Sequence, residues 1–114
     1  MKSISEYLQL LAGYMKANAA NYHITRMGIF GSVARGEETE VSDIDICFEG
    51  EAPTLFTLAR IKYELEELLG RPVDLVRVRD RMDEVLKQNI QKEAVYVKRF
   101  YIYLIKSLNL LRLF

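Results

Sequence analysis

The sequence predicts an α/β (α+β) fold in which a small mixed sheet of three or four strands is flanked by helices. Two observations support this prediction. Short runs rich in β-branched residues alternate with longer segments in which apolar residues recur every three or four positions. The 114 residues, of which 50% are hydrophobic, are also enough for one domain with a buried core.

The N-terminal part should begin with a helix over residues 3–17, since Ser3 and Glu6 have the spacing of a capping box. Apolar residues follow Ser3 at helical intervals. The run 24–30 is strand-like, 32–36 should form a short helical turn, and 37–42 a polar loop.

The second part starts with a strand-like run over residues 43–48. Pro53 suits a first helical turn and Gly70 a helix end, so the apolar residues between them predict a helix. A third strand over residues 73–78 and a helix over 83–91 complete the predicted elements.

Two acidic residues distinguish the second predicted strand. Successive side chains of a strand point to opposite faces, so Asp43 and Asp45 should share one face. Neighbouring carboxylates repel, and each raises the pKa of the other unless a cation lies between them. A hard divalent ion with oxygen ligands, such as Mg²⁺, would relieve this repulsion.

A glycine–serine turn precedes this acidic strand. Gly31 would let the backbone approach a ligand closely, and amides exposed at a turn or helix start can bind phosphate. The hydroxyl and amide of Ser32 are therefore candidate triphosphate ligands, and a plain helix N-cap is the compatible structural alternative. Arg35 could bind phosphate oxygens or pair with Glu37, Glu38 or a nearby aspartate.

The order Gly31-Ser32, ten residues and then Asp43-Ile44-Asp45 resembles the signature of the DNA polymerase β-like nucleotidyltransferases. The fuller string, with Ala34-Arg35-Gly36 and Ser42, resembles the minimal nucleotidyltransferase (MNT) branch. The resemblance covers roughly residues 20–95 and rests on several motifs at matching spacing.

The resemblance implies a nucleotidyltransferase fold, its strand order and a metal site. Asp43 and Asp45 would bind two Mg²⁺ ions, and Asp74 would bind the catalytic ion and accept the proton of the attacking hydroxyl. Two such ions could stabilise both the attacking and the leaving oxygen. The bland alternative is that Asp74 caps the turn after Pro72.

The amino-acid composition limits the classes of binding partner that we expect. Sixteen basic residues balance sixteen acidic ones, so the strongly basic footprint of a nucleic-acid-binding protein is absent. Cys47 cannot form an internal disulfide because it is the only cysteine, and it should pack in the core. Without a visible signal peptide or a membrane-length apolar stretch, we expect a cytoplasmic protein.

The chain should divide into a minimal nucleotidyltransferase domain over residues 1–99 and an apolar segment over 100–114. That segment could be a last helix packed on the domain, a homo- or hetero-oligomer interface, or a non-native tail. The resemblance does not extend to it.

Three functions fit these observations. The leading one is Mg²⁺-dependent transfer of AMP from ATP to a hydroxyl, and the MNT resemblance implies an antitoxin that modifies a tyrosine of a HEPN ribonuclease toxin. A second is a non-catalytic module that neutralises its partner by contact alone. A third, weaker one is nucleotidyl transfer to a small molecule or an RNA end.

Overall fold

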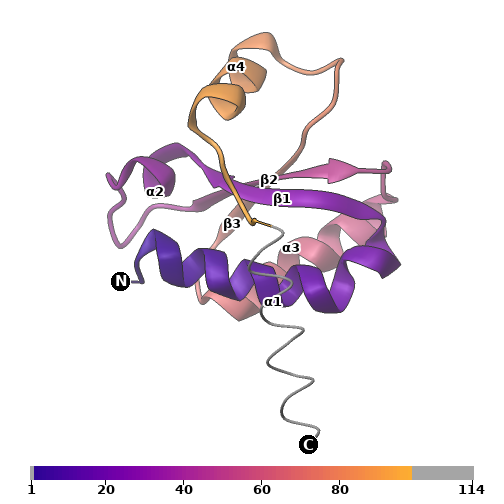
Figure 1. The fold of residues 1–114 in the computed structure, drawn as a ribbon, viewed down its shortest axis with the longest axis horizontal. Coiled ribbons are helices and arrows are strands. Elements are labelled where there is room, and N and C mark those ends of the chain that lie inside the picture. The colour runs from indigo at the N-terminus through magenta and orange to yellow at the C-terminus, as the bar shows by residue number, and fades with distance from the viewer. Residues whose placement is uncertain (1, 99–114) are drawn as a thin grey trace, which may run out of the picture.

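The computed structural model describes residues 2–98, which form a four-stranded mixed sheet with helices on both faces (Figure 1). The elements in chain order are α1 (Ile4–Tyr22), β1 (Ile24–Phe30), α2 (Gly31–Arg35), β2 (Ile44–Gly50), α3 (Leu55–Leu69), β3 (Val73–Arg77), α4 (Glu84–Glu93) and β4 (Val95–Tyr96). The predicted fold class is therefore confirmed.

The strand order is β3-β2-β1-β4. β1 is antiparallel to β2 and β4, whereas β2 is parallel to β3. The parallel connection runs through α3, which packs against the sheet together with α1. β2 lies between β1 and β3, so the second and third predicted strands are neighbours in the sheet.

Successive side chains of a strand point to opposite faces, so the strands contribute to one hydrophobic cluster on each face of the sheet. Ile44, Ile46 and Phe48 belong to the main core beneath α1 and α3. Cys47 joins a smaller cluster with Phe30 and Ile90 of α4 on the opposite face, so its predicted burial is confirmed. α4 therefore covers part of the face to which the odd-numbered residues of β2 belong (Figure 1).

Local signals fix most helix ends. Ser3 caps α1 in a complete capping box, and Gly70 ends α3 at a φ of 71°. Several predicted boundaries differ from the observed ones by one or two residues, and the largest difference is at the end of α1. α1 continues to Tyr22 rather than ending near residue 17, because Ala19 and Tyr22 pack on the core. α3 is capped by Thr54, so Pro53 lies before the helix and not in its first turn.

The short strand β4 has only two residues, too few for a periodic pattern to predict. It pairs Val95 and Tyr96 with Ile29 and Gly28. Among residues 2–98, no helix has the length and apolarity needed to cross a bilayer. The predicted segment 100–114, and with it the boundary at residue 99, lies outside the described residues.

Candidate active site

Two carboxylates from neighbouring strands lie side by side at one end of the sheet. In the parallel register of β2 and β3, Asp45 is paired with Asp74, so their side chains share a face. On its other side Asp45 is paired with Phe30, the last residue of β1. The expected meeting of Asp74 with the acidic strand is thus present, and the turn that follows β1 adjoins it.

Asp43 lies one residue before β2 and is exposed, whereas Asp45 is half-buried. Burial raises the pKa of Asp45 above its ordinary value, and the charges of Asp74 and Asp43 raise it further. Arg35 acts in the opposite direction and lowers this pKa. The carboxylates of Asp43 and Asp74 therefore repel that of Asp45 in the folded chain, as predicted.

Gly31 begins α2 at a φ of 71°, a conformation that side chains disfavour. A Cβ atom at this position would overlap the carboxylate of Asp45, lying 2.9 Å from its Cγ. The close approach expected of this glycine was to a ligand, and the group that lies against it in the structure is the side chain of Asp45. Gly31 thus allows the acidic strand to lie directly against the turn.

Ser32 follows in the first turn of α2 and is half-buried. The N-cap of this helix is Phe30, which makes no side-chain cap hydrogen bond, so the alternative that Ser32 is the N-cap is wrong. Within residues 2–98 the Ser32 hydroxyl makes no hydrogen bond. It is therefore available to a ligand beside Asp45.

Arg35 bridges two carboxylates. Its Nε donates to Glu37 Oε2 at 3.0 Å, and its Nη1 donates to Glu93 Oε2 at 2.9 Å. Pairing with Glu37 was one of the sequence alternatives, whereas Glu93 was missed. Glu93 is the last residue of α4, and its charge also raises the pKa of Asp45. One helix end thus contributes a further acidic group to the site.

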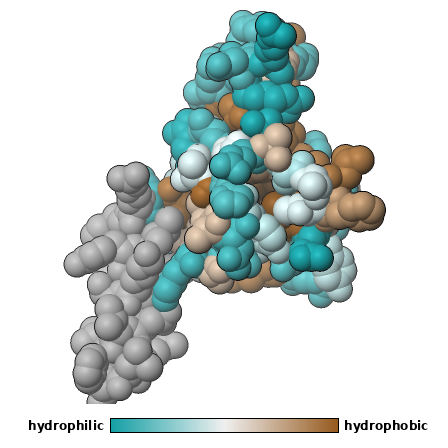
Figure 2. Space-filling model, turned by 90° about the vertical axis from the view of Figure 1, so that its right-hand side faces the viewer, coloured by the Kyte–Doolittle hydropathy of each residue, from teal (hydrophilic) through white to brown (hydrophobic). Residues whose placement is uncertain are grey.

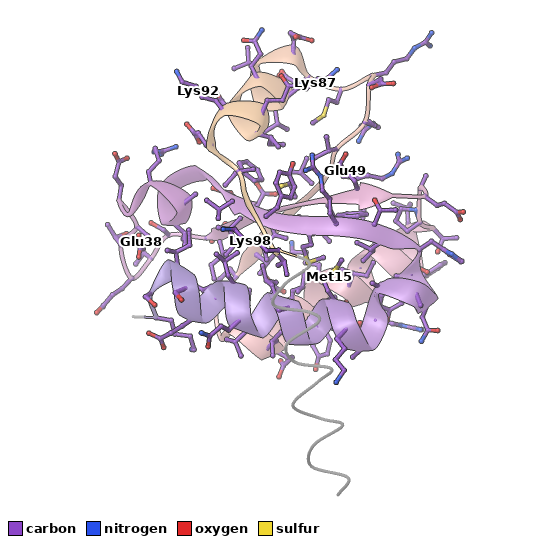
Figure 3. The ribbon with its side chains drawn as sticks, in the orientation of Figure 1. Met15, Glu38, Glu49, Lys87, Lys92 and Lys98 are labelled. Atoms are coloured by element: carbon purple, nitrogen blue, oxygen red, sulfur yellow. The ribbon has the colours of Figure 1, made fainter. Side chains whose placement is uncertain are left out.

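The loop between α2 and β2 is held by Arg71, which sequence reasoning also missed. Its Nη2 donates to the carbonyl of Thr39 at 2.8 Å and to that of Ser42. This contact fixes the backbone just before Asp43. Glu38 lies in the same loop (Figure 3). Its Oε2 is shielded from solvent and has no hydrogen-bond partner among the described residues.

The donor chemistry of this site fits a hard divalent cation, since Asp43, Asp45 and Asp74 offer only carboxylate oxygens and repel one another. In their present rotamers, however, no three acidic, histidine or cysteine side chains of residues 2–98 are close enough together to hold a metal ion. The pairing of β2 with β3 brings together residue types that suit a divalent ion, but their side chains would have to rotate to bind the same ion.

A family model described as a nucleotidyltransferase domain matches residues 11–97. A Methanocaldococcus jannaschii protein provisionally named a protein adenylyltransferase is 34% identical over 100 residues, covering 85% of this chain and all of the relative. The protein adenylyltransferase MntA of Thermococcus cleftensis is 33% identical over 98 residues, covering 85% of this chain and 98% of the relative.

Solved structures show the same fold. One provisionally described as a minimal nucleotidyltransferase has a TM-score of 0.64 and 35% identity, covering 82% of this chain and 95% of that chain. A toxin–antitoxin structure with AMP-PNP also has a TM-score of 0.64, at 18% identity, covering 89% and 86%. A complex of tri-AMPylated Shewanella oneidensis HEPN toxin with MNT antitoxin has a TM-score of 0.58, at 18% identity, covering 92% and 87%.

Proposed function

This chain belongs to the nucleotidyltransferase domain family, and from that premise we propose that it transfers AMP from ATP to a hydroxyl of a partner protein. The observation that carries the proposal is the pairing of Asp45 with Asp74 directly against the Gly31–Ser32 turn. The acceptor oxygen would bond to the α-phosphorus as the bond to the bridging oxygen of pyrophosphate breaks.

Each site residue has a role in this proposal. Asp43, Asp45 and Asp74 would hold two Mg²⁺ ions, which supply charge stabilisation for the attacking and leaving oxygens. Asp74 would also accept the proton of the acceptor hydroxyl. The free hydroxyl of Ser32 would donate to the triphosphate, and Arg35, already directed at carboxylate oxygens, would exchange one of them for a phosphate oxygen.

We further propose that the acceptor is a tyrosine of a HEPN ribonuclease toxin, which the modification silences, so that this chain acts as an antitoxin in the cytoplasm. Support comes from relatives named protein adenylyltransferase and from the MNT–HEPN complexes that share the fold. Most of residues 2–98 build the sheet and the helices that cover it, so the acceptor would come from a second chain.

One observation favours a second candidate. Since no three-ligand set is assembled within residues 2–98, the carboxylates could be idle and the chain could neutralise its partner by contact alone. The two candidates differ in whether Asp43 and Asp45 are needed. Transfer to a small molecule or an RNA end is a further variant of the enzymatic candidate.

The experiment is incubation of the chain with α-³²P-labelled ATP, Mg²⁺ and a HEPN protein encoded beside it, followed by intact-mass analysis. We expect added AMP with the wild type and none with Asp43→Ala/Asp45→Ala. If the wild type and Asp43→Ala/Asp45→Ala neutralise the HEPN protein equally and neither labels it, the contact-only module would be favoured. Label on an RNA or small-molecule acceptor, but not on protein, would favour the third variant.

A further inference from the structure

A cleft of about 880 Å³ lies on the α4 side of the sheet, near the ends of β2 and β3 that are remote from Asp45. Glu49 of β2 and Arg26 of β1 line it from the sheet, and Lys87 and Ile90 line it from α4. Figure 2 looks onto this end of the molecule, where the upper part is hydrophilic. The site described above does not include this cleft.

The cleft carries an excess of positive charge. Four basic side chains line it, Arg26, Arg77, Arg79 and Lys87, against two acidic ones, Glu49 and Asp80, which leaves two positive charges. Such an excess at a partly enclosed surface attracts anionic groups.

Three of these cations have no charged partner among residues 2–98, and one of them, Arg77, donates through Nε to the carbonyl of Gly50 at 3.0 Å. Arg26 pairs with Glu49, but Lys87 Nζ donates only to the backbone carbonyl of Asp80, at 3.2 Å. Arg79 Nη1 donates only to the carbonyl of Arg77, at 3.1 Å. A carbonyl group accepts the hydrogen bond without neutralising the charge, so Arg79 and Lys87 can still pair with carboxylates of a ligand.

The shape and the aromatic contact favour a polypeptide over a nucleic acid. The cleft is far larger than a single phosphate group needs, and Ile90 gives it an apolar wall. The ring of Tyr96 is already covered by the Arg26 guanidinium, 3.7 Å from the ring centroid, so it offers no free platform for a base on that side.

The cleft also has a defined relation to the reacting end of the sheet. Asp45 and Glu49 are four residues apart in β2 and therefore share a face. At ~3.3 Å per residue they are separated by ~13 Å along the strand. A chain segment held in the cleft would thus lie within a few residues' reach of the carboxylates.

We propose that this cleft binds an acidic segment of the protein acceptor, with Arg79 and Lys87 pairing with its carboxylates. The inference rests on the proposed function, because it gives that function its acceptor surface. It concerns binding rather than transfer, so it can be tested without any catalytic turnover.

The test measures binding of fluorescein-labelled octaglutamate to the full chain by fluorescence anisotropy. We expect Arg79→Glu/Lys87→Glu to weaken binding about tenfold or more, because two attractive contacts become repulsive. Lys92→Glu is the matched control, since Lys92 is exposed on the same helix but does not line the cleft (Figure 3). It should change the affinity less than twofold. Lys87→Gln, with the fold checked by circular dichroism, covers the case in which charge reversal disturbs folding.

Two results would overturn the proposal. One is equal weakening by Lys92→Glu and by the cleft variants, which would indicate general charge attraction. The other is tighter binding of an oligouridine of similar length than of octaglutamate, with the same dependence on Arg79 and Lys87. ATP binding, measured in parallel, reports separately on the proposed function, because it does not require the cleft.

Discussion

The carboxylate of Asp45 occupies the space into which any side chain at position 31 would project. Gly31 is therefore required twice, once for its φ of 71° and once for this contact. Gly36 provides a matched comparison, since it has a φ of 72° but a Cβ added there would meet nothing within 4 Å. A side chain at position 36 would introduce backbone strain alone, whereas one at position 31 would also displace the acidic strand.

We expect Gly36→Ala to lower the free energy of unfolding by roughly 1–2 kcal/mol, the cost of a left-handed alanine, and to retain AMP transfer. Gly31→Ala should cost more and abolish transfer, because Asp45 must move. Urea denaturation and transfer of labelled AMP would measure the two effects. Equal losses of stability and activity in both variants would contradict this account.

The second prediction concerns the pH dependence of stability. Because the pKa of Asp45 is raised in the folded state, that state holds this proton more tightly than the unfolded chain does. Stability is therefore lost as the pH rises from the ordinary value of 3.8 through the raised pKa. Asp45→Asn should remove this loss and be more stable than the wild type at neutral pH without metal.

Urea denaturation of both proteins in EDTA, at intervals from pH 4 to pH 8, would measure this difference. We expect it to increase with pH and then level off. A metal-free Asp45→Asn variant that is less stable than the wild type at pH 7 would show that Asp45 stabilises the fold. AMP transfer by Asp45→Asn should fall by about a thousandfold or more.

The third prediction concerns Mg²⁺. A ligand that binds only the folded state stabilises it by about 2.7 kcal/mol at a hundred times its dissociation constant. Mg²⁺ with a non-hydrolysable ATP analogue should therefore raise the melting temperature of the wild type, and EDTA should reverse the increase. Asp45→Asn and Asp74→Asn should show a much smaller increase. An equal increase in all three proteins would place the metal elsewhere.

Sequence patterns located much of this site for a physical reason. The motifs Gly31-Ser32 and Asp43-Ile44-Asp45 can be recognised from neighbours along the chain. Their approach depends on the antiparallel pairing of β1 with β2, which places Phe30 opposite Asp45, and Asp43 lies one residue before β2. The pairing of Asp45 with Asp74 needed the strand order, which the family resemblance supplied and β2 and β3 confirm.

Glu93 and Arg71 were not found, because their contacts depend on packing between distant segments. Glu93 reaches Arg35 only because α4 crosses the face that bears Asp45, and no local period encodes that crossing. Arg71 contacts a loop 29 residues or more earlier in the chain.

The last prediction concerns the two partners of Arg35. If Arg35 exchanges a carboxylate for a phosphate of ATP, Arg35→Ala should raise the KM for ATP by roughly tenfold to a hundredfold, as for loss of a charge-assisted hydrogen bond. Glu93→Gln should lower this KM, because it releases Arg35 and also removes a charge that acts on Asp45.

Glu37→Gln is the matched control, since Glu37 binds the same guanidinium from the adjacent loop and is not among the groups that shift the pKa of Asp45. We therefore expect a smaller decrease for Glu37→Gln, measured by steady-state transfer at saturating acceptor. An unchanged KM in Arg35→Ala would show that Arg35 serves only to tie α4 to α2.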